Sequence, residues 1–154
     1  MQLSVYLFED QAIKAALQPL TQHRTVAELW VGTSTLKSKW PTRVSSPEKA
    51  DIQVMSSVLP LPSTFEILNQ LPADSSFVYQ GQMLAQRGKG IHTLEKHLPF
   101  LKHPEELLNF QSDFLRTEIK GNNPSPGNNT FICSEEIYIH PSASVKGSIL
   151  DASQ

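Results

Sequence analysis

Apolar positions dominate the start of the chain, where residues 3–8 alternate between apolar and polar and then become continuously apolar. This pattern predicts a strand buried on both faces of a mainly parallel sheet. Residues 11–18 are rich in alanine and predict a short helix, which Pro19 ends because a residue before proline avoids the helical conformation. We expect the strand to lie at the centre of its sheet, with residues 19–32 crossing its carboxyl end.

Later segments continue this alternation of strands and helices. Proline next to two glutamates at residues 104–106 marks a helix start, where a missing N–H and negative charge are both favourable. The other patterns predict a helix over residues 36–40, a strand around 52–55, a helix over 63–71, a strand or hairpin over 76–85 that breaks at Gly81, and a helix over 104–120. The fold class is therefore α/β, a sheet with flanking helices.

The last thirty residues differ from the rest of the chain. Residues 122–131 are rich in Asn, Pro and Gly, a composition that predicts a linker. After this linker Cys133, Ile139 and Val145 are six apart, with Ala143 and Ile149 four after the last two, which resembles the hexapeptide repeat of left-handed parallel β-helices. We expect an α/β domain over residues 1–121 and a first β-helix coil over 132–154. Because such a helix needs about three coils, we expect the chain to be part of a longer protein.

Composition narrows the class of protein. The 154 residues fit one domain with a real core, and the net charge of −2 with scattered basic residues argues against nucleic acid as a partner. There is no apolar run of membrane-span length and no basic start typical of a signal peptide, so we expect a cytoplasmic protein without membrane contact. The five histidines lack metal-site spacing, and both tryptophans, Trp30 and Trp40, are expected in the core.

One motif carries a family resemblance. The first predicted strand ends in the acidic pair Glu9-Asp10, and Pro19-Leu20-Thr21-x-x-Arg24 follows it. This order resembles the sugar nucleotidyltransferases related to bifunctional N-acetylglucosamine-1-phosphate uridyltransferase, over residues 3–40 and 132–150. The resemblance implies a reduced, Rossmann-like nucleotidyltransferase sheet with flanking helices, followed by the start of a left-handed β-helix.

The resemblance also places the candidate site residues. The family's glycine-rich loop falls on residues 10–16, which hold no glycine, and the family's arginine and lysine fall on Ala16 and Val26. Nearby cations that could replace them are Lys14 and Arg24, the predicted catalytic residues. The predicted substrate-binding residues are Thr21, Glu9, Asp10 and Glu28.

The residues alone leave simpler interpretations open for four of these side chains. The acidic pair could be solvated or could cap the next helix, and Arg24 and Glu28, four apart, could form a helical ion pair.

Two functions follow from the resemblance. The first is transfer of a nucleotide from a nucleoside triphosphate to a sugar 1-phosphate, for which such chemistry implies magnesium. Because the loop and both cations are replaced, we expect this activity to be weak or absent. The alternative is a non-catalytic domain that binds a sugar nucleotide or serves in the assembly of an acyltransferase-type β-helix protein. In both cases the partner is a nucleotide sugar or sugar phosphate, and the β-helix predicts a homo-oligomer.

Overall fold

The structure of the chain is a computed structural model that describes residues 3–118, 130–132, 137, 139 and 145–151. Within these residues, five strands form one sheet in the order β1-β4-β6-β5-β7. The strands are β1 (Val5–Phe8), β4 (Ile52–Met55), β5 (Ser75–Tyr79), β6 (Gln82–Gln86) and β7 (His92–Glu95).

Four strands of this sheet run in one direction. β1 is parallel to β4 and β5 is parallel to β7, whereas β6 is antiparallel to both β4 and β5. Hence β1, β4, β5 and β7 all end on one side of the sheet, which we call the carboxyl edge. Open α/β sheets bind their ligands outside such an edge.

The predicted position of β1 is only partly confirmed. β1 is parallel to β4, as expected, with Val5 opposite Ile52, but it is the outermost of the five strands rather than a central one. Its outer side is covered by the chain at Arg43, which forms a parallel bridge to Val5. The apolar run did not distinguish a central strand from an outer one, because the loop at Arg43 buries Val5 while the other three residues of β1 stay half-buried.

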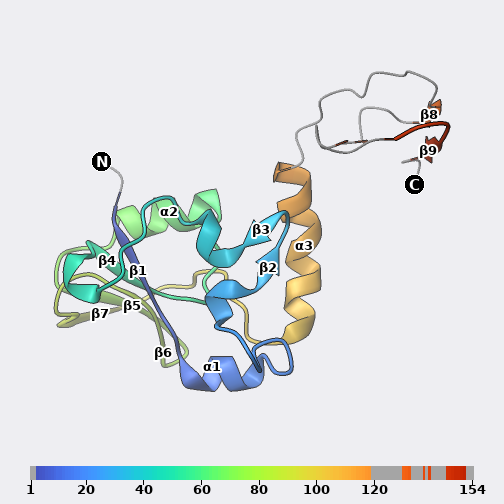
Figure 1. Cartoon of the computed structure of the whole chain (residues 1–154). Coiled ribbons are helices and arrows are strands. Elements are labelled where there is room, and N and C mark those ends of the chain that lie inside the picture. Colours follow the sequence, from blue (N-terminus) through green and yellow to red (C-terminus); the bar gives the residue numbers. More distant parts are fainter. Residues whose placement is uncertain (1–2, 119–129, 133–136, 138, 140–144, 152–154) are drawn as a thin grey trace.

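Helices lie at the ends and side of the sheet. As Figure 1 shows, α1 (Gln11–Ala16) follows β1 directly, and α3 (Pro104–Glu118) stands beside the hairpin of β2 (Trp30–Val31) and β3 (Ser34–Thr35). α2 (Pro62–Asn69) begins with its proline at the first helical position, where the missing N–H costs nothing. Three short 3₁₀ turns cover Val26–Glu28, Leu36–Lys39 and Pro47–Lys49.

Most predicted elements are present. The helices over residues 11–18, 63–71 and 104–120 correspond to α1, α2 and α3, and the segment over 36–40 is a 3₁₀ turn. The predicted break at Gly81 is a hairpin turn in which Gln80 (φ 50°) and Gly81 (φ 79°) both have positive φ, the geometry of a type I′ turn.

The two tryptophans differ in burial. Trp40 is buried, with 1% of its surface exposed, and packs edge-on against Phe65 with ring centroids 5.2 Å apart. Trp30 is 59% exposed, so its predicted place in the core is wrong. The reason is the alternation of strand β2, which points Val31 into the core and Trp30 outward.

The C-terminal strands form a separate parallel pair. β8 (Thr130–Ile132) pairs with β9 (Ile149–Asp151), with Thr130 opposite Ile149. The described part of the chain shows no β-helix coil, and two of its predicted positions, Cys133 and Ala143, lie outside the described residues, as does most of the predicted linker.

Candidate functional site

The acidic pair lies at the carboxyl edge, where β1 and β4 end side by side. Glu9 accepts a hydrogen bond from the Val26 backbone N–H through Oε2 (3.0 Å), and its Oε1 forms an ion pair with Lys14 Nζ (2.7 Å). Residues 19–32 therefore do cross the end of β1, as the sequence predicts. The positive charge of Lys14 is matched by the carboxylate beside it.

Asp10 caps the helix that replaces the glycine-rich loop. Its Oδ1 accepts from the Ile13 backbone N–H (3.0 Å), and its Oδ2 accepts from Gln82 Nε2 (2.8 Å). The bond from Ile13 is the main reason that the pKa of Asp10 is lowered, and the bond from Gln82 adds to it against the opposing effect of burial. The backbone N–H groups of Ile13 and Lys14, which a glycine loop could offer to a phosphate, here donate to the side chain and the carbonyl of Asp10.

Magnesium does not fit the acidic pair as it stands. Three of the four carboxylate oxygens of Glu9 and Asp10 already accept a hydrogen bond, and the fourth forms the ion pair with Lys14. Among the described residues, no group of three His, Cys, Asp or Glu side chains is placed to hold a metal ion. The described arrangement is thus a hydrogen-bonded edge rather than a metal centre.

The Pro-Leu-Thr segment packs against this edge. Thr21 is buried (1% exposed), and its hydroxyl donates to the Lys14 backbone carbonyl (2.6 Å). Val26, at the family's lysine position, is also buried. Thr21 thus ties the loop to α1 and fixes the backbone that carries Lys14.

The remaining two predicted residues lie apart from the acidic pair. Arg24 is exposed, and no ion pair joins it to Glu28 in the described residues. Glu28 instead closes a capping box on the Thr25 N–H (3.0 Å) and pairs with Lys37 Nζ (3.0 Å). The bond from Thr25, with that from Lys37, lowers the pKa of Glu28 to about 2.

Sequence reasoning did not select Gln82, although it holds one oxygen of Asp10. Gln82 is the first residue of β6, directly after the hairpin turn, and it comes from 72 positions further along the chain. A polar residue opening the second strand of a predicted hairpin was the only signal. Its contact with Asp10 depends on the strand order, which the sequence does not state.

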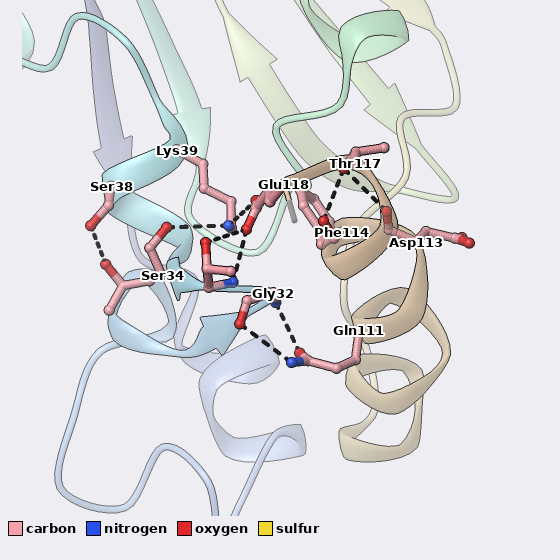
Figure 2. A network of polar contacts seen from close by, with 11 residues as sticks. Gly32, Ser34, Ser38, Lys39, Gln111, Asp113, Phe114, Thr117 and Glu118 are labelled. Atoms are coloured by element: carbon pink, nitrogen blue, oxygen red, sulfur yellow. Dashed lines mark hydrogen bonds and ion pairs between the residues drawn. The ribbon is translucent and has the colours of Figure 1, made fainter. Parts of the chain in front are cut away.

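A second polar cluster joins α3 to the β2–β3 hairpin (Figure 2). Glu118 accepts from the Thr33 N–H (2.8 Å) and hydroxyl (2.7 Å) and forms an ion pair with Lys39. Gln111 exchanges hydrogen bonds with the Gly32 backbone. Burial raises the pKa of Glu118, but the bonds from Lys39 and Thr33 outweigh burial and leave it lowered. The polar groups of this cluster are bonded to one another, so we interpret the cluster as a contact that holds α3 against the hairpin.

The fold and the edge define an α/β domain of the kind that binds ligands where parallel strands end. The sugar nucleotidyl transferase family matches residues 5–122, and the chain belongs to that family. No curated protein and no solved structure matched the chain in the two other comparisons. In the described part of the chain, no helix has the length and apolar character that crossing a bilayer requires.

Proposed function

We propose that this chain is a nucleotidyltransferase domain that joins a nucleoside triphosphate to a sugar 1-phosphate, with low turnover. The observation that carries the proposal is the acidic pair Glu9-Asp10, which together with Lys14 occupies the carboxyl edge of two neighbouring parallel strands. Membership of the sugar nucleotidyl transferase family supports the reaction class.

The proposed reaction is an in-line displacement at phosphorus. A phosphate oxygen of the sugar 1-phosphate attacks the α-phosphorus of the triphosphate, the bond to the β-phosphate breaks, and pyrophosphate leaves. Such transfer depends on positioning and on cations that stabilise the phosphates. We assign the cationic role to Lys14 and Arg24 and substrate contacts to Asp10 and Glu28. The buried Thr21 fixes the backbone of Lys14, and Glu9 holds the Lys14 ammonium group until a phosphate displaces it.

Low turnover follows from how these groups are engaged. Lys14 is held by Glu9 at 2.7 Å, so a phosphate has to displace that carboxylate before it gains the charge. α1 stands where the family has its loop, and Asp10 already takes the Ile13 N–H at the start of that helix. No step of the reaction is assigned to a metal held by the protein, since the acidic pair does not offer free ligands.

The same contacts favour a second candidate, a domain that binds a sugar nucleotide without turning it over. The hydrogen bonds of Glu9 and Asp10 stabilise the protein without substrate, so a sugar nucleotide would be bound by the exposed groups around them. In that case catalysis, such as acyl transfer, belongs to another part of the protein.

A β-helix and a homo-oligomer are part of the proposal. The supporting observation is the parallel pairing of Thr130 with Ile149, nineteen residues later, close to the eighteen of three hexads. Parallel pairing after one such turn is what a coil of hexads produces.

Pyrophosphate release tests the two candidates. The chain is incubated with magnesium, each of the four common nucleoside triphosphates and a panel of sugar 1-phosphates. We expect release below about 1 per second, the low end for enzymes, reduced further in Lys14→Met and unchanged in the surface control Lys49→Met. Binding of nucleotide sugar without any release favours the second candidate, and neither binding nor release contradicts both.

A further inference from the structure

Lys102 is held in place without a counter-charge. Its Nζ donates to the amide oxygen of Gln80 (3.0 Å) and lies over the rings of Phe100 (5.1 Å) and Tyr79 (5.8 Å). Aromatic rings and amides hold an ammonium group but leave its charge intact. Three other lysines, Lys14, Lys37 and Lys39, each face a carboxylate, whereas no ion pair involves Lys102 in the described residues.

Contacts place Lys102 at the carboxyl edge, where β5 ends at Tyr79. Tyr79 ends β5 and pairs with Gln82, so their side chains lie on the same face of the sheet. Gln82 in turn donates to Asp10. A continuous series of contacts therefore runs from Asp10 through Gln82 and Tyr79 to Lys102.

The backbone that carries Lys102 is fixed on both sides. The Leu101 N–H donates to the Ser57 carbonyl (3.0 Å), and the Leu59 N–H donates to the Pro99 carbonyl (2.9 Å), which ties this segment to the chain after β4. Glu106 Oε2 accepts hydrogen bonds from the backbone N–H groups of Lys102 (2.6 Å) and His103 (3.2 Å), and in the described residues no ion pair joins this carboxylate to Lys102 Nζ. Glu106 thus fixes the position of Lys102 through its backbone.

We infer that Lys102 binds the phosphate group of a sugar phosphate at this edge, an inference that rests on the proposed function. A fixed ammonium group with unspent charge can form the strong, charge-assisted hydrogen bonds that phosphate oxygens accept. Lys14 cannot do so without losing Glu9. The half-buried Tyr79 and its strand neighbour Gln82 connect this cation to Asp10, and we place the sugar hydroxyls along these two side chains.

Calorimetric titration of the full chain with glucose 1-phosphate, N-acetylglucosamine 1-phosphate and unphosphorylated glucose tests this inference. Lys102→Met keeps the aliphatic packing over the rings and removes the charge. We expect it to weaken binding of the sugar phosphates about tenfold and to leave glucose binding unchanged. Lys102→Arg should stay within about threefold of wild type, and the exposed control Lys96→Met should bind as wild type does.

The outcomes separate the inference from the function on which it rests. Wild-type binding that Lys102→Met does not weaken overturns the role of Lys102 and leaves the proposed function intact. A wild-type chain that binds neither sugar phosphate also overturns it, and the pyrophosphate assay then decides the proposed function independently. Thermal unfolding of each variant shows whether a loss of binding reflects a loss of fold.

Discussion

At the scale of single residues, Glu9 decides whether the positive charge of Lys14 is available to a phosphate. It holds Lys14 with one oxygen and the Val26 N–H with the other. In the protein without substrate, the Glu9 carboxylate thus competes with any phosphate for the ammonium group of Lys14. Glu9 therefore limits affinity as well as shaping the edge.

The substitution Glu9→Gln tests this. Its amide oxygen can keep the bond from Val26, while Lys14 loses its counter-charge and becomes available to a phosphate. We expect affinity for a nucleoside triphosphate to rise about tenfold, the size of one charge-assisted bond, as measured by calorimetry. Glu66→Gln, at an exposed position of α2, serves as the control. An unchanged or lower affinity in Glu9→Gln would show that Lys14 does not meet the phosphates.

Gly32 is a second residue whose identity is fixed by its surroundings. Its φ is +66°, and a Cβ there would lie 2.6 Å from Glu118 Oε2 and 2.8 Å from Phe114 Cβ. We expect Gly32→Ala to lower the free energy of unfolding by about 2–4 kcal/mol, the sum of backbone strain and overpacking. Chemical denaturation measures it.

Gly81→Ala is the matched control for that experiment. Gly81 has φ +79° but nothing within 4 Å of an added Cβ, so only the backbone cost of about 1 kcal/mol applies. If the two substitutions lower the free energy of unfolding equally, α3 does not pack as closely against Gly32 as described.

At the scale of elements, the 3₁₀ turn Val26–Glu28 depends on one ionised carboxylate. Glu28 accepts from the Thr25 N–H and pairs with Lys37, which lowers its pKa from 4.5 to about 2. A carboxyl with a lowered folded-state pKa stabilises the fold above its unfolded pKa, and that contribution disappears as the pH falls through the folded value.

The pH dependence of Glu28→Gln follows. We expect the variant to be less stable than wild type above pH 4.5, and the difference to shrink between pH 4.5 and about 2. Urea unfolding of both proteins over this range is the measurement. A difference that does not change with pH would mean that the carboxylate is not ionised in this role.

Several elements could be predicted from local sequence because their signals are local. Pro104 and the two glutamates after it mark the start of α3. Gly81 marks the β5–β6 turn, because glycine readily adopts the positive φ that it has there. The β2–β3 hairpin was not predicted, since strands of two residues carry no periodicity.

The candidate site shows the same division. Glu9 and Asp10 could be placed at a strand end because they follow an apolar run in the sequence. Their partners could not all be predicted, because Gln82 reaches Asp10 across 72 positions through the order of the strands. The alternative in which Arg24 pairs with Glu28 requires a longer helix, whereas a three-residue 3₁₀ turn is present there.

At the scale of the whole molecule, the carboxyl edge is assembled from four chain segments that meet only in the folded sheet. β1, β4, β5 and β7 all end there, and the chain after β7 returns past Ser57 and Leu59. The family match ends at residue 122, before β8. In the proposed function, substrate binding belongs to the sheet and assembly to the C-terminal residues.

Light scattering on the whole chain and on a version that ends at Asn129 tests the proposed assembly. We expect the whole chain to associate and the shorter one to be monomeric, because a sheet of only two strands has two edges that can pair with another chain. Circular dichroism confirms that both are folded. Equal, monomeric masses would contradict an oligomer formed through β8 and β9.

Helix α3 is held by hydrogen bonds at both ends, so a displacement of one end is transmitted to the other. Its first turn holds the Lys102 N–H through Glu106, and its last turn holds the Thr33 N–H through Glu118. Fifteen residues separate the ends by about 22 Å. Because α3 is held at both ends, we expect the phosphate binding that we infer for Lys102 to displace the whole helix and to alter its contacts with the β2–β3 hairpin. Amide hydrogen exchange at Gly32 and Thr33 should therefore respond to glucose 1-phosphate, although neither residue touches it.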